Sequence, residues 1–181
     1  DAIAAGANAV AQWKSAQQAD RKPRQHQYRT VVRWTGDNGT GTSGYKNYRR
    51  DHVIEADGKP AIPASSDPHF LGDAARWNPE ELLVASLSAC HQLWYLHLCS
   101  DAGVVVTSYV DRAEGLMVEQ ANGKGRFTRV VLRPMVTIRA GSDADLATAL
   151  HHKAHEMCYI ARSVSFPVDC EPVVTRDEAG I

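Results

Sequence analysis

Four cysteines and a group of histidines are the side chains of this sequence whose chemistry could support a function. Cys90 lies in an apolar stretch, where a cysteine usually packs as a small hydrophobic residue but can also act as a nucleophile once ionised. The same two interpretations apply to Cys158, near the end of a later helical stretch. Cys170 stands between Asp169 and Glu171, whose charges disfavour a thiolate. Cys90 and Cys158 are therefore the candidate reactive thiols.

A metal site is the second kind of chemistry to consider. One predicted helix carries His151, His152, His155 and Cys158. His151 and His155 are four residues apart and could share an ion, but the Glu-containing zincin motif is absent and no Cys-x-x-Cys pair occurs. Cys90, His91 and His97 would have to supply the remaining ligands. We therefore expect no metal and no other cofactor, and we interpret the histidines as polar residues on a partly exposed helix face.

A long helix is expected to position Cys90. Asn78 is a good N-cap, and Glu81 follows it at the spacing of a capping box. No Gly or Pro interrupts the chain from Glu80 to Gly103, and apolar or small residues cover nearly the whole circumference, which indicates a buried helix. Cys99 lies about 900° around this helix from Cys90, on the opposite side, and is interpreted as structural.

The remaining elements indicate an α+β fold with antiparallel sheet rather than a doubly wound parallel one. Strands are expected at Gln27–Trp34, Tyr45–Glu55, Val104–Met117, Arg126–Ile138 and Ser165–Val174. Pro134 argues for an edge position or a bulge in the fourth of these strands. A second helix is expected to be capped by Ser142 and to end at about Met157 or Tyr159.

Length and composition limit the possible classes of protein. The 181 residues fit one domain, at 26–181, preceded by a helical extension and linker at 1–25. The 20 basic and 21 acidic residues are balanced, so neither nucleic acid nor a membrane surface is an expected partner. No uninterrupted apolar run approaches the length of a membrane span. Four cysteines are too few for a secreted disulfide scaffold, so we predict a reducing, cytoplasmic location.

Several motifs together resemble the OsmC/Ohr family of osmotically inducible protein C and organic hydroperoxide resistance proteins. They are Asn-Pro-Glu-Glu-Leu-Leu at 78–83, Ala-Cys-His at 89–91, the Gly-Thr to Tyr-x-Arg run at 41–50, Gly-Asp at 72–73, Leu-Arg-Pro at 132–134 and His-Glu-Met-Cys at 155–158. The resemblance covers roughly residues 26–174. The chain departs from the family pattern at Tyr159, where Pro is common, and at Trp94-Tyr95 with Cys99.

The resemblance implies an OsmC-like fold, an intertwined homodimer and a cysteine-based peroxidase that acts on organic hydroperoxides. By the matching motifs, Cys90 is the peroxidatic cysteine and Cys158 the resolving one. Glu80 matches the active-site glutamate. The active-site arginine matches Arg50, or else its neighbour Arg49.

The chemistry of such a site is consistent with these residue types. A thiolate attacks the distal peroxide oxygen and becomes a sulfenic acid, which a second thiol converts to a disulfide. A nearby guanidinium favours the thiolate, and a glutamate orients the guanidinium through a bidentate pair. Apolar walls from Leu93, Trp94 and Met157 would suit an alkyl hydroperoxide. An external dithiol must then reduce the disulfide.

Two alternatives remain open. A family member could use Cys90 to bind or detoxify another electrophile, or the protein could be a non-catalytic dimer whose cysteines only pack. Glu80 and Cys90 are also about 15 Å apart along one helix, too far for a glutamate side chain to cover. If both serve one site, the simplest arrangement is a two-fold axis at which each subunit supplies Glu80 and Arg50 to its partner's Cys90.

Overall fold

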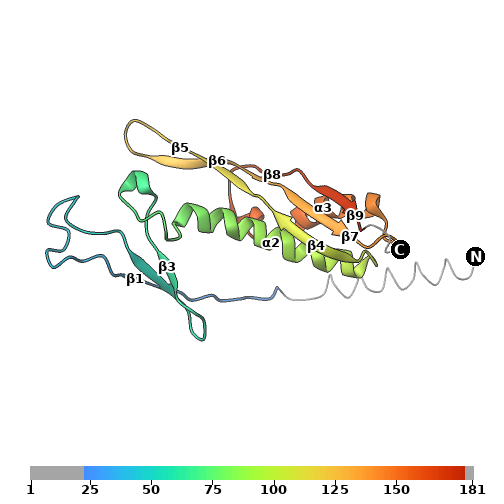
Figure 1. Ribbon diagram of the computed structural model, residues 1–181, viewed down its shortest axis with the longest axis horizontal. Coiled ribbons are helices and arrows are strands. Elements are labelled where there is room, and N and C mark those ends of the chain that lie inside the picture. The colour runs from blue at the N-terminus through green and yellow to red at the C-terminus, as the bar shows by residue number, and fades with distance from the viewer. Residues whose placement is uncertain (1–22, 178–181) are drawn as a thin grey trace, which may run out of the picture.

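The computed structural model describes residues 23–177, and the helix predicted within residues 1–20 lies outside them. The described elements are β1 (Val31–Trp34), β2 (His52–Glu55), β3 (Ile62–Ala64), η1 (Pro68–Phe70), α2 (Pro79–Asp101), β4 (Val106–Asp111), β5 (Glu114–Glu119), β6 (Gly125–Leu132), β7 (Pro134–Ile138), α3 (Ala144–Met157), η2 (Ala161–Ser163), β8 (Val168–Cys170) and β9 (Val173–Arg176). Two α-helices packed with small sheets confirm the predicted α+β class (Figure 1).

Helix α2 begins and ends as its sequence predicts. The Asn78 side chain accepts a hydrogen bond from the Glu81 N–H at 2.8 Å, and the Glu81 carboxylate accepts one from the Asn78 N–H at 3.2 Å. This reciprocal pair is the predicted capping box. Gly103 adopts a φ of 74° just after the helix, and the N–H of Val104 closes the last turn by donating to the Cys99 carbonyl.

The expectation that α2 is buried all round is wrong for a single chain. Its buried residues form one row with a spacing of four: Leu87, His91, Tyr95 and Cys99. This row faces the sheets and α3. Leu93, on another side, is 67% exposed. The apolar circumference therefore provides more hydrophobic surface than this chain covers.

The composition of α2 also resembles that of a membrane span. By length and composition it is the one helix among residues 23–177 that could cross a bilayer, although it contains no uninterrupted apolar run of that length. Core helices of soluble proteins have the same composition.

Each of the two long strands predicted between the helices is broken into two. Val104–Met117 becomes β4 and β5, and Arg126–Ile138 becomes β6 and β7, so that β4 pairs with β7 and β5 with β6 in separate antiparallel ladders. At the break, the Arg133 N–H donates to the Asp111 carboxylate at 2.7 Å, and Pro134 has no N–H to donate. Pro134 opens β7, a position that tolerates proline, and β7 is the central strand of its sheet rather than an edge.

The C-terminal strands differ from the predicted antiparallel arrangement. The single strand expected at Ser165–Val174 is two strands, β8 and β9. They pair in parallel with β6 and β7, respectively. The three-stranded orders are β5-β6-β8 and β4-β7-β9. Residue Cys170 thereby ends a strand beside Leu132, directly above the buried row of α2.

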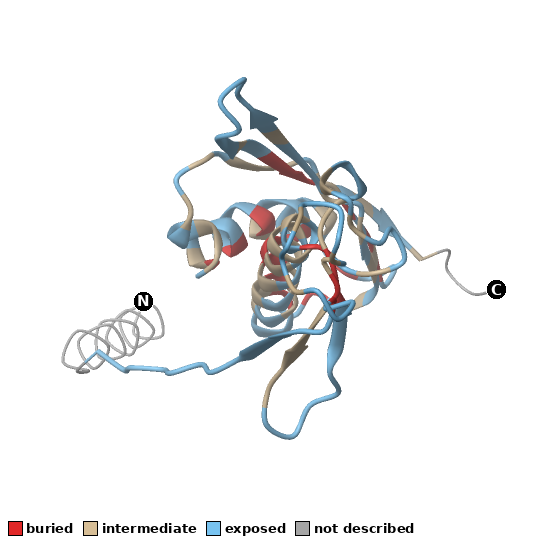
Figure 2. Ribbon diagram, turned by 90° about the vertical axis from the view of Figure 1, so that its left-hand side faces the viewer, coloured by how far each residue is buried: buried red, intermediate tan, exposed pale blue. Residues whose placement is uncertain are grey.

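The first three strands form a separate antiparallel sheet in the order β1-β2-β3, beyond the N-terminal end of α2 (Figure 1). The predicted strand Tyr45–Glu55 is shorter than expected, because only His52–Glu55 is extended and paired. The preceding residues form a loop that is held in part by a hydrogen bond from the Trp34 indole to the Arg49 carbonyl at 2.8 Å. β1 is exposed along its whole length (Figure 2).

Helix α3 packs on α2 and completes the core. Its N-cap is Asp143 rather than the predicted Ser142, because the Asp143 carboxylate accepts from two backbone N–H groups of the first turn. The Ser142 hydroxyl instead accepts from the Val105 N–H at 3.0 Å. The helix ends at Met157, as predicted, and Cys158 is its C-cap residue.

Candidate functional site

Cys90 lies at an apolar cavity on the surface of α2. The thiol is half-buried, and the cavity has a volume of about 290 Å³. Its lining residues are Cys90, Leu93, Trp94, His97 and Tyr159. The first four follow one another at helical spacing, so the regular geometry of α2 presents them on one face. Leu93 and Trp94 are walls that the sequence predicts, whereas Met157 does not line this cavity.

Cys158 lies beside Cys90, buried at the end of α3. Burial raises the pKa of the Cys158 thiol to about 11, the N–H of Ala161 opposes that rise, and the adjacent Cys90 thiol adds to it. The Ala161 N–H lies 3.4 Å from the Cys158 sulfur. The structure thus brings together the two candidate thiols, one beside a cavity and one enclosed. Both are free thiols.

Tyr159 forms the outer wall of the cavity at a position where the family pattern often has proline. Its ring meets Trp94 edge to face, with centroids 5.6 Å apart and planes at 83°. Trp94 contacts the His97 ring in the same manner at 5.8 Å. These contacts form an aromatic wall next to Cys90 from α2 and from the turn that follows α3.

Arg50 is held by aromatic rings and carbonyl oxygens in the loop before β2. Its guanidinium lies 4.4 Å from the centroid of the Tyr45 ring and 4.2 Å from that of Tyr48. It donates to the backbone carbonyls of the same two residues at 2.6 Å. Arg49 is exposed and forms an ion pair with Asp51 at 3.5 Å. The side chain of Arg50 is therefore held in place by two rings and two carbonyl groups, whereas the side chain of Arg49 is exposed.

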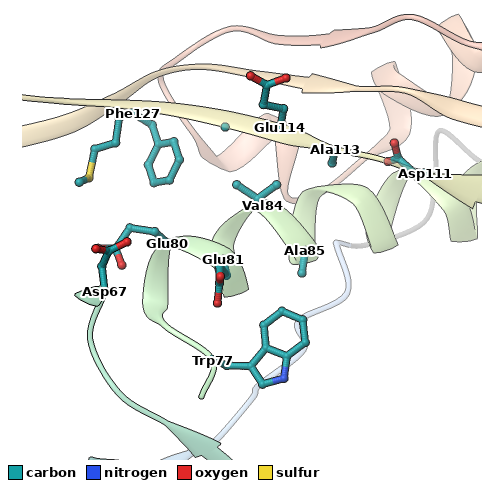
Figure 3. Close-up of a pocket in the computed structure, with 12 residues that line it drawn as sticks. Asp67, Trp77, Glu80, Glu81, Val84, Ala85, Asp111, Ala113, Glu114 and Phe127 are labelled. Carbon is teal, nitrogen blue, oxygen red and sulfur yellow. The ribbon is translucent and has the colours of Figure 1, made fainter. Parts of the chain in front are cut away.

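Glu80 lies in the first turn of α2 and faces a different cavity from Cys90. This cavity, of about 590 Å³, lies between α2 and the β5-β6 hairpin (Figure 3). Its acidic lining residues are Asp67, Glu80, Glu81, Asp111 and Glu114. Glu80 forms no ion pair among residues 23–177, and no hydrogen bond or ion pair of Arg50 within that range involves Glu80 or Cys90. One chain does not assemble the four predicted residues into one site.

A buried cluster that the sequence prediction missed lies one residue beyond Cys90. The His91 Nε2 is 3.0 Å from the His151 Nδ1, and the Cys170 sulfur is 3.6 Å and 4.0 Å from these two nitrogens. His91 and His151 are 1% and 2% exposed. The interpretation of the helix-face histidines as partly exposed is therefore wrong for His151, although it holds for His152 and His155.

Burial keeps all three groups of this cluster uncharged at neutral pH. It lowers the pKa of His91 to about 4 and that of His151 to about 3, and it raises the pKa of Cys170 to about 12. The Asp111 carboxylate opposes the shift at His91 and adds to the shift at Cys170. The four-residue spacing of Leu87, His91 and Tyr95 along one apolar row was the sequence pattern that could have indicated a buried histidine.

These shifts predict that the metal-free protein loses stability in mild acid. In the unfolded chain both histidines titrate near 6.5, so the unfolded state takes up protons that the folded state does not. Their stabilisation is therefore complete above about pH 6.5 and decreases as the pH falls toward the folded pKa values. Each histidine contributes about 1.4 kcal/mol per pH unit between about pH 6 and 4.5.

Urea unfolding at a series of pH values in the presence of a chelator measures this dependence. His151→Gln should reduce the slope by about half, because one of the two shifted groups is removed. The matched variant His152→Gln changes an exposed neighbour whose charge makes the smallest contribution to the lowered pKa of His151, so it should leave the slope nearly unchanged. Equal slopes in all three proteins would contradict the assignment of the acid sensitivity to the buried pair.

Comparison with known proteins shows which family this chain resembles in sequence and structure. The family model described as "OsmC-like protein" matches residues 72–172. An OsmC-like protein of unknown function from Vibrio cholerae is 35% identical, with a TM-score of 0.75 over 82% of this chain and 100% of that chain. A search of curated proteins gives no significant match.

More distant solved structures share the fold. An organic hydroperoxide resistance protein from Elizabethkingia anophelis is 18% identical, with a TM-score of 0.58 over 85% of this chain and 100% of that chain. An organic hydroperoxide resistance protein from Legionella pneumophila is 20% identical, with a TM-score of 0.56 over 83% of this chain and 99% of that chain. At these sequence identities, the similarity of the two structures to this chain shows a shared fold alone.

Proposed function

This chain belongs to the OsmC-like protein family, and on that premise we propose that it is a thiol-dependent peroxidase that reduces organic hydroperoxides. The observation that carries the proposal is the pair of thiols, with Cys90 at an apolar cavity and Cys158 enclosed directly behind it. The surface that the lining residues expose to the cavity is almost entirely apolar, which favours the carbon chain or ring of an organic hydroperoxide over hydrogen peroxide. Distant structural neighbours described as organic hydroperoxide resistance proteins are consistent with it.

The proposed reaction uses two thiols in turn. The Cys90 thiolate attacks the distal peroxide oxygen, the O–O bond breaks, and the alkoxide takes a proton to leave as an alcohol. Cys90 is then a sulfenic acid. The Cys158 sulfur attacks it, the S–O bond breaks, and the Cys158 proton leaves with the hydroxyl group as water. An external dithiol reduces the resulting disulfide by exchange and is itself oxidised to a disulfide.

The raised pKa of Cys158 suits a resolving role. A thiol with a pKa of about 11 is protonated at neutral pH, so it does not compete with Cys90 for the peroxide. Its proton is then available to the leaving hydroxyl group. Because Cys158 is already beside Cys90, disulfide formation can outpace further oxidation of the sulfenic acid.

The proposed active unit is a homodimer. Glu80 and Arg50 do not meet Cys90 within one chain, and the exposed side of α2 presents uncovered apolar surface. A two-fold axis across this surface would bury it and bring the partner's Arg50 and Glu80 to the Cys90 cavity. The arginine would stabilise the thiolate, and the glutamate would orient the arginine through a bidentate pair.

Counting thiols after reaction tests the proposed function. One equivalent of cumene hydroperoxide per chain should remove two of the four thiols, and peptide mapping should recover a Cys90–Cys158 disulfide. In Cys158→Ser the same treatment should remove one thiol and leave a sulfenic acid that a dimedone-type reagent captures at Cys90. Loss of one thiol in the unmodified protein would favour reaction of Cys90 with a different electrophile, and no loss would favour a non-catalytic dimer.

A further inference from the structure

The cluster of His91, His151 and Cys170 has no part in the proposed peroxide reaction, yet it joins three separate elements. His91 comes from α2, His151 from α3 and Cys170 from the end of β8. Their ligand atoms all lie within 4.8 Å of one another, in the buried layer where the two helices and the sheet meet. Neutral imidazole and thiolate are the two ligand types that zinc and other thiophilic ions prefer.

The separations between the donor atoms fit a first coordination sphere. With the usual zinc–nitrogen and zinc–sulfur bond lengths, a tetrahedral ion needs about 3.3 Å between two nitrogens and about 3.6 Å between a nitrogen and a sulfur. The structure has 3.0 Å between the nitrogens, and 3.6 Å and 4.0 Å from them to the sulfur. Shifts of a few tenths of an ångström would therefore bring the three donor atoms to the separations that one ion requires.

The metal-free state is held by a hydrogen bond between the two rings. The ring planes differ by only 6°, and the ring centroids are 5.3 Å apart. The two rings therefore lie edge to edge, nearly in one plane, with the two hydrogen-bonded nitrogens between them. One of the facing nitrogens carries a proton and the other accepts it. To bind an ion, the rings must turn toward Cys170, and the shared proton must move to an outer ring nitrogen. The two outer nitrogens, His91 Nδ1 and His151 Nε2, are buried without a hydrogen-bond partner among the described residues.

The charge around the cluster suits a divalent cation. Zn²⁺ bound to a Cys170 thiolate carries one net positive charge, and the Asp111 carboxylate acts on both His91 and Cys170. This carboxylate is fixed by the Ser88 hydroxyl at 2.5 Å and the Arg133 N–H at 2.7 Å. The bound ion would therefore be balanced without an unpaired charge in the interior.

An opening leads from the cluster to solvent. A cavity of about 270 Å³ reaches His151 and Cys170 from the surface. Its other lining residues are His152, His155, Val168, Asp169 and Pro172. His152 and His155 are exposed at this opening. A water molecule in the cavity can take the fourth coordination position.

We propose that His91 Nε2, His151 Nδ1 and Cys170 Sγ form a binding site for a thiophilic divalent cation, with Zn²⁺ as the ion that fits the donor set. Binding exchanges the Cys170 thiol proton for a metal–sulfur bond and releases that proton to solvent. The ion joins α2, α3 and β8 behind the Cys90 face of the helix. This site is independent of the peroxidase proposal, because it uses none of the residues assigned to that reaction.

Titration of tag-free protein with Co²⁺ and Zn²⁺ tests the site. Co²⁺ should give one equivalent per chain with a thiolate-to-cobalt charge-transfer band, and Zn²⁺ should displace it. At a hundredfold excess over its dissociation constant, Zn²⁺ should raise the melting temperature by about 5–10 °C. Cys170→Ala should lose both the band and the shift. His152→Gln, which keeps all three ligands, should retain both.

The Cys90–Cys158 thiol pair is the competing metal ligand that the experiment must separate. Cys90→Ser should bind Co²⁺ as the unmodified protein does, because Cys170 still supplies the thiolate. X-ray absorption of the zinc-loaded unmodified protein should show one sulfur ligand and at least two nitrogen ligands, a result that requires no folded variant. Two sulfur ligands, a charge-transfer band that survives Cys170→Ala, or no binding at all would overturn the proposal.

Discussion

Replacing Cys90 by serine is expected to abolish the reduction of organic hydroperoxides and to leave the fold nearly intact. The hydroxyl group is a far weaker nucleophile than a thiolate, so the rate should fall to that of the uncatalysed reaction. The two side chains are close in volume. Cys90 is only half-buried, so the cost of the new hydroxyl group should be about 1 kcal/mol. Consumption of cumene hydroperoxide with a dithiol reductant measures the rate, and urea unfolding measures the stability.

Two other cysteines serve as matched controls for this substitution. Cys99→Ser and Cys170→Ser each remove a thiol that lies outside the Cys90 cavity, so peroxide consumption should be unchanged. Cys99 is buried against α3 and the β4-β7 pair, and its variant is therefore expected to lose stability rather than rate. Substantial activity in Cys90→Ser, or loss of activity in folded Cys170→Ser, would contradict the assignment of Cys90 as the reacting thiol.

Mixing two inactive proteins, Cys90→Ser and Glu80→Ala, is expected to restore activity. The reason is geometric. Glu80 and Cys90 are about 15 Å apart along α2 and border different cavities of one chain. If the partner subunit supplies Glu80, a mixed dimer contains one site with an intact cysteine and an intact glutamate. Random exchange makes half of the dimers mixed, so activity should reach about a quarter of that of the unmodified protein.

The control for this experiment is the double variant Cys90→Ser with Glu80→Ala. Mixed with Glu80→Ala, it provides no intact glutamate to any subunit, so activity should stay absent. Subunit exchange must be shown independently, for example by native mass spectrometry of isotopically labelled protein. Proven exchange without recovered activity would mean that each site is built within a single chain.

Local sequence patterns determined the helices and the pair of candidate thiols. The Asn78–Glu81 capping box and the glycine at position 103 act within one turn of the chain, so their outcome does not depend on distant contacts. The family motifs placed Cys90 and Cys158 as partners, and the structure brings them side by side. Their roles in peroxide reduction stay a prediction.

The tertiary structure decided how the strands are divided and joined. Nothing in the β-branched content of Val104–Met117 marks the change of sheet. At the break, the Asp111 carboxylate at the end of β4 accepts a hydrogen bond from the N–H of Arg133, which lies between β6 and β7. The parallel pairing of β8 and β9 likewise requires partners about forty residues away in sequence. Long-range pairing is invisible to local propensity, which sees only each strand's own residues.

The same reason explains why the buried histidine cluster was missed. His91, His151 and Cys170 lie in three different elements, and no local spacing connects them. A histidine is compatible with either face of a helix, and its burial is decided by what packs against that face. The sequence by itself determined the helices, the pair of candidate cysteines and the family. Only the packing of α2, α3 and β8 against one another decided which polar residues share the interior, because burial depends on contacts between elements rather than on the order of residues within them.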